Sequence, residues 1–348
     1  MIKLLIVDDS PFIRKALIKM VQSEPDIEVV GEAANGKDGV QMVLDLDPDV
    51  VTMDVEMPLM DGISALKEIM TKHPVPVIMF SSLTEEGAKV TLEALEAGAV
   101  DYLSKDIQGS SLSIFDKKHL IIEKIKNASK AKIKNLISHK INLITLPTSK
   151  KEDKIEKKEK KYEVLTIGTS TGGPPALERV IPNLSKGISM PVLVVQHMPP
   201  IFTKSLAERL NSLSPLQVKE AEHNEVIDDN IVYIAPGGHH MKLKKHGSRY
   251  IINIFDMDSL YTPSVDFLFN SVGGFFKDKT LGVVMTGMGH DGLEGSRTIK
   301  HFHGTVIAQD EESCVVYGMP RVVIENKLAD FVLPLEQIAF KIMKLVMN

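Results

Sequence analysis

Three side chains in the second half of the chain could together hydrolyse an ester or amide. Ser170 lies in the pentad 168–172, which fits G-x-S-x-G and follows an apolar run. A serine on a sharp turn between a strand and a helix exposes its hydroxyl as a nucleophile. The same serine could instead cap a helix that begins near Pro174, because hydroxyl groups also bind backbone N–H groups.

A nucleophilic serine needs a base and a carboxylate that orients the base. His197 ends the next apolar run, "VLVVQH", so the ends of two neighbouring parallel strands can bring it beside Ser170. Asp291 follows the glycine-rich stretch "LGVVMTGMGHDG", where it could fix the imidazole tautomer or cap its own helix. In that stretch the N–H of Met288 is a candidate oxyanion donor, and the Thr171 hydroxyl could orient the site or cap a helix.

Acidic residues in the first half predict a divalent metal site. Asp8 and Asp9 close the first apolar run and Asp54 closes the third. The carboxyl ends of parallel strands meet at one edge of a sheet, where three carboxylates repel one another unless a cation such as Mg²⁺ or Mn²⁺ binds. Ser81 and Lys105 end the next two runs and could bind an anion beside the metal.

The elements that must position these residues form two α/β units. In the first 135 residues, strand and helix patterns alternate five times through "KLLIVD", "IEVVGE", "DVVTMD", "PVIMFS" and "AVDYLS". This alternation of strand and helix patterns predicts a flavodoxin-like, doubly wound parallel sheet. The second half shows the same alternation, with strand patterns at "EVLTIG", "MPVLVVQ", "DNIVYIAP", "TLGVVMTG" and "GTVIAQ" and a hairpin over 241–253. We therefore predict a second, Rossmann-like α/β domain with a mainly parallel sheet.

A charged tract separates the two units. We predict one domain at 1–138, a linker at 139–161 and a second domain at 162–348. Residues 117–161 hold fifteen lysines and five acids, a charge of +10, whereas the remainder carries -15. Such a run could bind nucleic acid, but the second domain has no helix-turn-helix signature, so we interpret it as a solvated helix and linker and expect no nucleic-acid partner.

Cysteine usage and hydropathy indicate a cytoplasmic protein. The only cysteine, Cys314, excludes an intrachain disulfide and is expected to be a small buried side chain. No apolar run reaches the roughly 18 residues of a membrane span, and Asp8 interrupts the first run too early for a signal peptide. We expect no insertion into the membrane.

The first unit resembles the response-regulator receiver domain over about 120 residues, through "LLIVDDS", "VVTMDVEMPLMDGISAL", "IMFSS" and "DYLSK". The resemblance implies that Asp54 accepts a phosphoryl group, which pairs with Lys105. It also implies Mg²⁺ ligands at Asp8, Asp9 and Asp54, and a switch pair at Ser81 and Tyr102. Receivers usually carry proline where this chain has Asp106, which leaves the loop geometry after Lys105 open.

The second unit resembles the catalytic domain of the CheB family of chemotaxis protein-glutamate methylesterases. The similar segments are "IGTSTGGPPALERVIPNL", "VVQHMPPIFTKSLAERLN", "VYIAPGGHHM", "MTGMGHDG" and "AQDEESCVVYGMP". The resemblance implies a triad of Ser170, His197 and Asp291 without a cofactor, and an esterase restrained by its receiver until phosphorylation. The implied partners are chemoreceptor cytoplasmic domains and a phosphodonor histidine kinase, with glutamine deamidation as a second activity of some members.

A nucleotide-binding module is the main alternative from another functional class. A receiver could be joined to a Rossmann-like domain whose glycine loop holds phosphates. The fingerprint G-x-G-x-x-G requires glycine where this chain has Ser170, which argues against that alternative.

Overall fold

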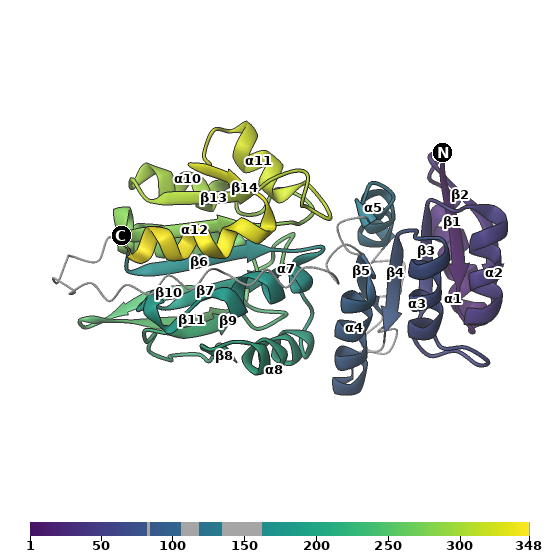
Figure 1. Cartoon of the computed structure of the whole chain (residues 1–348), viewed down its shortest axis with the longest axis horizontal. Coiled ribbons are helices and arrows are strands. Elements are labelled where there is room, and N and C mark those ends of the chain that lie inside the picture. The colour runs from purple at the N-terminus through teal and green to yellow at the C-terminus, as the bar shows by residue number, and fades with distance from the viewer. Residues whose placement is uncertain (82–83, 106–117, 134–161, 348) are drawn as a thin grey trace, which may run out of the picture.

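The chain folds into two α/β units that lie side by side (Figure 1). The computed structural model describes residues 1–81, 84–105, 118–133 and 162–347. The predicted linker 139–161 and Asp106 lie outside the described residues. Within the described ranges, no helix combines the length and apolar character needed to cross a membrane.

The N-terminal unit is a five-stranded parallel sheet in the order β2-β1-β3-β4-β5, which confirms the predicted doubly wound domain. Its strands are β1 (Ile2–Val7), β2 (Ile27–Ala33), β3 (Val50–Asp54), β4 (Val77–Ser81) and β5 (Asp101–Ser104). Its helices are α1 (Pro11–Val21), α2 (Gly36–Leu46), α3 (Gly62–Lys72), α4 (Glu85–Ala97) and α5 (Lys118–Ala128).

Two apolar layers cover the faces of this sheet. Leu4 and Ile6 of β1 pack with residues of α1 and α5, whereas Leu5 and Val7 face α2, α3 and α4. The alternation follows from the two-residue period of a strand and explains why β1 is apolar on both faces. Ser10 caps α1, and Pro11 occupies the first turn of that helix, where its missing N–H costs nothing.

The C-terminal unit is a seven-stranded parallel sheet in the order β14-β13-β12-β6-β7-β9-β8. Its strands are β6 (Val164–Thr169), β7 (Val192–Gln196), β8 (Gln217–Glu220), β9 (Ile231–Ile234), β12 (Thr280–Val284), β13 (Thr305–Gln309) and β14 (Phe331–Leu333). The predicted hairpin is confirmed as the antiparallel pair β10 (His240–His246) and β11 (Arg249–Phe255).

Helices cover both faces of the larger sheet. They are α7 (Gly173–Val180), α8 (Phe202–Leu213), α9 (Val265–Phe276), α10 (Leu293–His301), α11 (Met319–Glu325) and α12 (Leu335–Met347). Three short 3-10 turns accompany them: η3 (Ile181–Asn183), η4 (Lys186–Ile188) and η5 (Lys277–Lys279). β6 is buried along its whole length between β12 and β7, so the carboxyl ends of these three strands form one edge.

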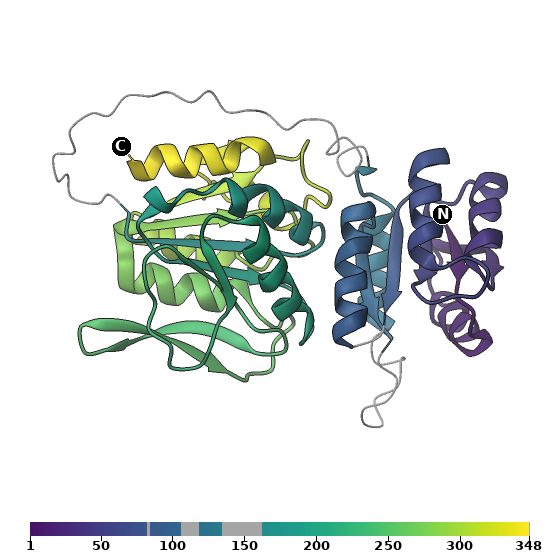
Figure 2. The same ribbon diagram turned by 60° about the horizontal axis from the view of Figure 1, so that its bottom comes forward.

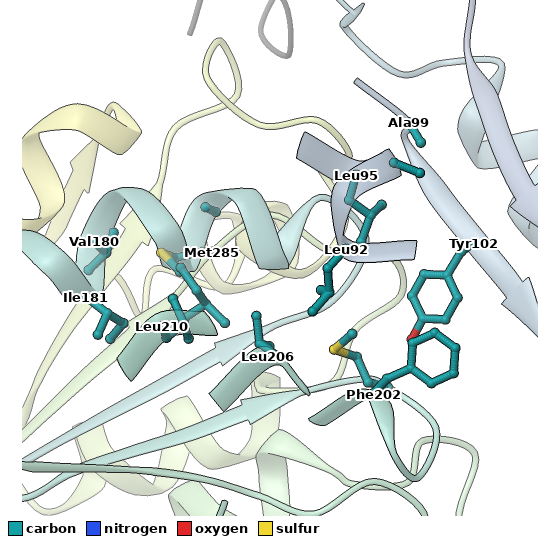
Figure 3. Close-up of a cluster of buried hydrophobic side chains, with 14 of the residues drawn as sticks. Leu92, Leu95, Ala99, Tyr102, Val180, Ile181, Phe202, Leu206, Leu210 and Met285 are labelled. Atoms are coloured by element: carbon teal, nitrogen blue, oxygen red, sulfur yellow. The ribbon is translucent and has the colours of Figure 1, made fainter. Parts of the chain in front are cut away.

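The two units meet through an apolar junction. In both views α4 and β5 of the smaller unit lie toward the larger unit, and α4 packs against α7 and α8 (Figure 2). Figure 3 shows side chains of both units in one buried cluster that includes Leu92, Leu95, Ala99, Tyr102, Val180, Ile181, Phe202, Leu206, Leu210 and Met285. The Tyr102 ring stacks on Phe202 with a centroid distance of 4.8 Å.

Ion pairs surround this apolar cluster. Arg209 of α8 bonds Glu178 within its own unit and reaches Glu96 of α4 at 2.8 Å. Lys204 lies 3.9 Å from Glu85 at the start of α4. Exposed pairs of this kind contribute little stability, so the buried apolar contact dominates the junction.

Candidate active site

The turn after β6 places Ser170 ahead of α7 without making it the cap of that helix. Gly172, with φ 76°, is the N-cap of α7, and no side chain caps that helix end. The capping alternative for Ser170 is therefore wrong. The backbone of Ser170 is held by Thr286 O, which accepts from its N–H at 3.0 Å, and by Gln196 Nε2, which donates to its carbonyl at 2.9 Å.

Glycine is required at the left-handed position of this turn. A Cβ on Gly172 would lie 2.6 Å from the Cβ of Val315, and its positive φ is unfavourable for other residues. The tight turn leaves the Ser170 side chain 9% exposed at the wall of a cavity.

His197 and Asp291 form a direct pair beside Ser170. His197 Nε2 lies 2.8 Å from Asp291 Oδ2, and Tyr261 stacks on the imidazole at a centroid distance of 4.9 Å. His197 follows β7, which is paired with β6, so the predicted adjacency of the two strand ends is confirmed. Within the described residues no hydrogen bond joins the Ser170 hydroxyl to His197, although both side chains line the same cavity.

Asp291 is held by donors from another helix. It is 2% exposed and accepts from Val265 N at 2.6 Å and from the Ser264 hydroxyl at 2.9 Å, at the start of α9. The N-cap of its own helix is Gly292, so the alternative of Asp291 as that cap is wrong. Burial alone would raise the pKa of Asp291, but the hydrogen bond with His197 and the backbone N–H groups hold this pKa below its usual value.

A glycine-rich turn brings backbone close to the serine. A Cβ on Gly287 would lie 2.9 Å from the Cβ of Ser170, so a side chain there would push the turn away. Met288 follows in this turn, is 7% exposed and lines the cavity. Its role as an oxyanion donor stays a prediction.

The N-terminal unit forms the other wall of this cavity, which encloses about 520 Å³. Thr171 does not cap α7; its hydroxyl donates to Asp101 Oδ2 of the N-terminal unit at 2.5 Å. Asp101 also pairs with Lys124 Nζ of α5 at 2.7 Å. The residue after Ser170 is thus bonded to the N-terminal unit.

A second site lies at the carboxyl edge of the smaller sheet. Carboxylate oxygens of Asp8, Asp9 and Asp54 lie within 4.8 Å of one another, and Lys105 Nζ lies 2.5 Å from Asp54 Oδ2 and 3.0 Å from Asp8 Oδ2. Three hard oxygen ligands at this spacing fit Mg²⁺. Burial, with a smaller effect from Asp8, raises the pKa of Asp54 to about 6 although Lys105 opposes the shift.

The two residues of the implied switch pair lie in different surroundings. Ser81 is buried in the cleft beside Asp54 and Lys105, and its hydroxyl donates to Gly87 O at 3.2 Å. Tyr102 lies in the junction against Phe202, where burial raises the pKa of its phenol. Cys314 is buried, as expected.

Comparisons with known proteins identify both units. The family model described as CheB methylesterase matches residues 165–342, and the model of the response regulator receiver domain matches residues 4–114. The chain belongs to the CheB methylesterase family. Its receiver precedes the CheB domain, in the order that the sequence motifs indicate.

Relatives in the CheB family are similar from end to end. A "protein-glutamate methylesterase/protein-glutamine glutaminase" of Thermotoga maritima is 45% identical and aligns with 99% of this chain and 98% of its own length. A Pyrococcus abyssi protein of the same name is 41% identical over 99% of this chain and 94% of its own. The crystal structure of the T. maritima CheB catalytic domain is 48% identical with a TM-score of 0.52, covering 53% of this chain and 99% of that domain.

Sequence reasoning missed three residues beside the CheB site. Tyr261 stacks on His197, Asp101 bonds Thr171, and Asp266 lies next to Asp291. Tyr261 and Asp266 flank the stretch "TPSV", where Pro263 and Ser264 before an apolar helix provide a capping signal that could have drawn attention to them. Asp101 ends no apolar run, and no local pattern marks a contact between two domains.

Proposed function

We propose that this protein demethylates glutamate methyl esters on methyl-accepting chemoreceptors through Ser170, His197 and Asp291, as part of chemotaxis adaptation. The observation that carries the proposal is the 2.8 Å pair of His197 with Asp291, because His197 lines the same cavity as Ser170. The name shared by the relatives supports the ester substrate and favours hydrolysis of receptor glutamines as a second activity.

The chemistry is acyl transfer through a serine ester. Because Asp291 holds Nε2 of His197, the other ring nitrogen, Nδ1, is available to take the Ser170 proton. Ser170 Oγ bonds to the ester carbonyl carbon, and methanol leaves with the proton that His197 returns. Water then attacks the acyl-enzyme with His197 as base, which releases glutamate and frees Ser170. With glutamine the leaving group is ammonia.

Backbone groups around the serine stabilise the oxyanion in this mechanism. The Thr171 N–H follows the nucleophile at the start of α7, and the Met288 N–H lies in the turn that approaches Ser170. Donors fixed in a buried cavity are ready before charge develops, which is the condition for effective transition-state stabilisation.

The receiver regulates the esterase in our proposal. Asp54 takes a phosphoryl group from a chemotaxis histidine kinase, Lys105 pairs with it, and Asp8 and Asp9 hold Mg²⁺ together with Asp54. The ion, when bound, neutralises charge between the acids and the phosphoryl oxygens. Because α5 closes the cavity and Asp101 bonds Thr171, separation of the two units is the step that opens the site to a receptor helix in the cytoplasm.

The decisive test is the variant Ser170→Ala. Purified and folded, it should release methanol from methylated receptor at least about 10³-fold more slowly than the wild type, because the nucleophile is gone. Ser212→Ala, at an exposed serine of α8, is the matched control and should keep full activity. If Ser170→Ala kept a tenth of the wild-type rate, the proposed function would be wrong.

The receiver assignment is tested by phosphorylation with a small phosphodonor. Labelling should require Mg²⁺ or Mn²⁺, stop in excess EDTA and be absent from Asp54→Asn. Asp38→Asn, at an acid in the first turn of α2, is the control and should be labelled normally. Labelling that persists in EDTA would contradict the metal site.

A further inference from the structure

A second buried acid, Asp266, lies beside Asp291 and takes no part in the mechanism above. The two helices α9 and α10 begin side by side, and each receives its capping carboxylate from the other. Asp291, just before α10, accepts from Val265 N at 2.6 Å and Asp266 N at 2.9 Å. Asp266, in the first turn of α9, accepts through Oδ1 from Gly292 N at 3.0 Å and Gly295 N at 2.6 Å.

This exchange of caps determines where the Asp291 carboxylate lies. Each carboxylate occupies the positive end of a helix dipole that belongs to its neighbour. The helices are packed closely, because a Cβ on Gly295 would lie 2.4 Å from the Cβ of Phe269 and 3.2 Å from Asp266 Oδ1. Asp291 cannot move relative to His197 without breaking bonds at the start of both helices.

The two acids differ in protonation because their donors differ. Asp291 receives additional hydrogen bonds from His197 and Ser264 and stays ionised. Burial, then the charge of Asp291, raises the pKa of Asp266 to about 7. Near neutral pH part of the population therefore holds a carboxylic acid at Asp266, which can donate a hydrogen bond to Asp291.

The other charged groups on the elements around α9 have partners or positions of their own. On α10, Glu294 and Arg297 pair with each other in solvent at 3.3 Å, and Lys242 of β10 lies over the Phe255 ring. β6, β7 and β12 carry no ionisable side chain, and η5 lies at the far end of α9. Asp291, which is paired with His197, is therefore the charged group that raises the pKa of Asp266.

We propose that Asp266 is a positioning residue of the active site, whose carboxyl, held by the N-terminus of α10, keeps Asp291 aligned with His197. This inference rests on the proposed triad. Asp266 touches neither Ser170 nor the cavity, so its effect should fall on kcat and leave KM unchanged. Its negative charge, when present, favours the imidazolium that forms as His197 takes the serine proton.

The test compares full-length wild type, Asp266→Asn and Asp266→Ala between pH 6 and pH 8. Asparagine keeps an acceptor for the α10 N–H groups and a donor for Asp291, so at pH 6 its kcat should stay within about threefold of the wild type. Alanine should lower kcat roughly tenfold or more at unchanged KM. Glu294→Gln, at the exposed acid of the same helix pair, is the control and should match the wild type at every pH.

The pH profile distinguishes alignment from a merely structural role. The pKa of Asp266 is about 7. As the pH rises through this value, Asp266 becomes negatively charged in the wild type, whereas the asparagine side chain of Asp266→Asn cannot ionise. The ratio of wild-type to Asp266→Asn kcat should then rise roughly threefold to tenfold. A ratio that does not change with pH, or a folded Asp266→Ala with wild-type kcat, would overturn the inference. Ser170→Ala reports separately on the triad, so these failures leave the proposed function standing.

Discussion

The contact between Thr171 and Asp101 allows the regulatory proposal to be tested with one conservative substitution. Asp101 is 6% exposed, and its carboxylate accepts from Thr171 Oγ1 at 2.5 Å and Tyr102 N at 2.7 Å, besides pairing with Lys124. Asp101→Asn keeps the shape of the side chain and removes its charge. Lys124 retains a partner, because its Nζ also donates to Tyr102 O at 3.2 Å.

The expected magnitude follows from the loss of charge in one buried hydrogen bond. A hydrogen bond to a charged group contributes about 1.5 to 3 kcal/mol, and a neutral one about 0.5 to 1.5 kcal/mol. The difference of about 1 kcal/mol shifts an equilibrium between closed and separated units roughly fivefold. Without a phosphodonor, the esterase rate of Asp101→Asn should therefore rise about fivefold, up to the rate of the fully separated form.

The assay is the initial rate of methanol release from methylated receptor, with and without a small phosphodonor and Mg²⁺. The variant should raise the unstimulated rate and leave the stimulated rate unchanged, because only the closed arrangement contains the altered bond. Glu93→Gln is the matched control, since this receiver acid also pairs with a lysine, Lys67 at 2.8 Å, away from the cavity. An unstimulated rate equal to that of the wild type, in a folded variant, would refute the reasoning.

Two further substitutions test the receiver. In metal-free buffer Asp54→Asn should raise the free energy of unfolding at pH 8, because burial raises the pKa of Asp54 to about 6 and its ionised form destabilises the fold above that pH. Denaturant titrations should show the gain shrinking below pH 6, and an equal gain at pH 5 would contradict it. Tyr102→Phe removes a buried hydroxyl that lacks a hydrogen-bond partner among the described residues, so the thermal midpoint should rise; a lower midpoint would show that the hydroxyl has a partner.

Residues at strand ends could be placed from the sequence because parallel sheets align their carboxyl ends. Ser170 and His197 are adjacent since β6 and β7 pair directly, and Asp54 meets Asp8 since β3 pairs with β1. Tertiary contacts that no repeating sequence pattern indicates could not be predicted. Asp266 meets Asp291, which lies 25 residues further along the chain, where the starts of two helices come together. The strand β8 was missed because its sequence, QVKE, holds a single apolar residue, and β14 was missed because it has only three residues.

A single strand connects the two proposed sites. β5 begins at Asp101, which bonds Thr171, continues through Tyr102 in the junction, and ends one residue before Lys105, which pairs with Asp54. Four residues of strand span only about 13 Å. A phosphoryl group that draws Lys105 away from its present carboxylate partners acts at one end of the strand whose other end bonds the residue after Ser170. Coupling between phosphorylation and esterase activity therefore needs no long network, and Asp101 is where it should be most sensitive to substitution.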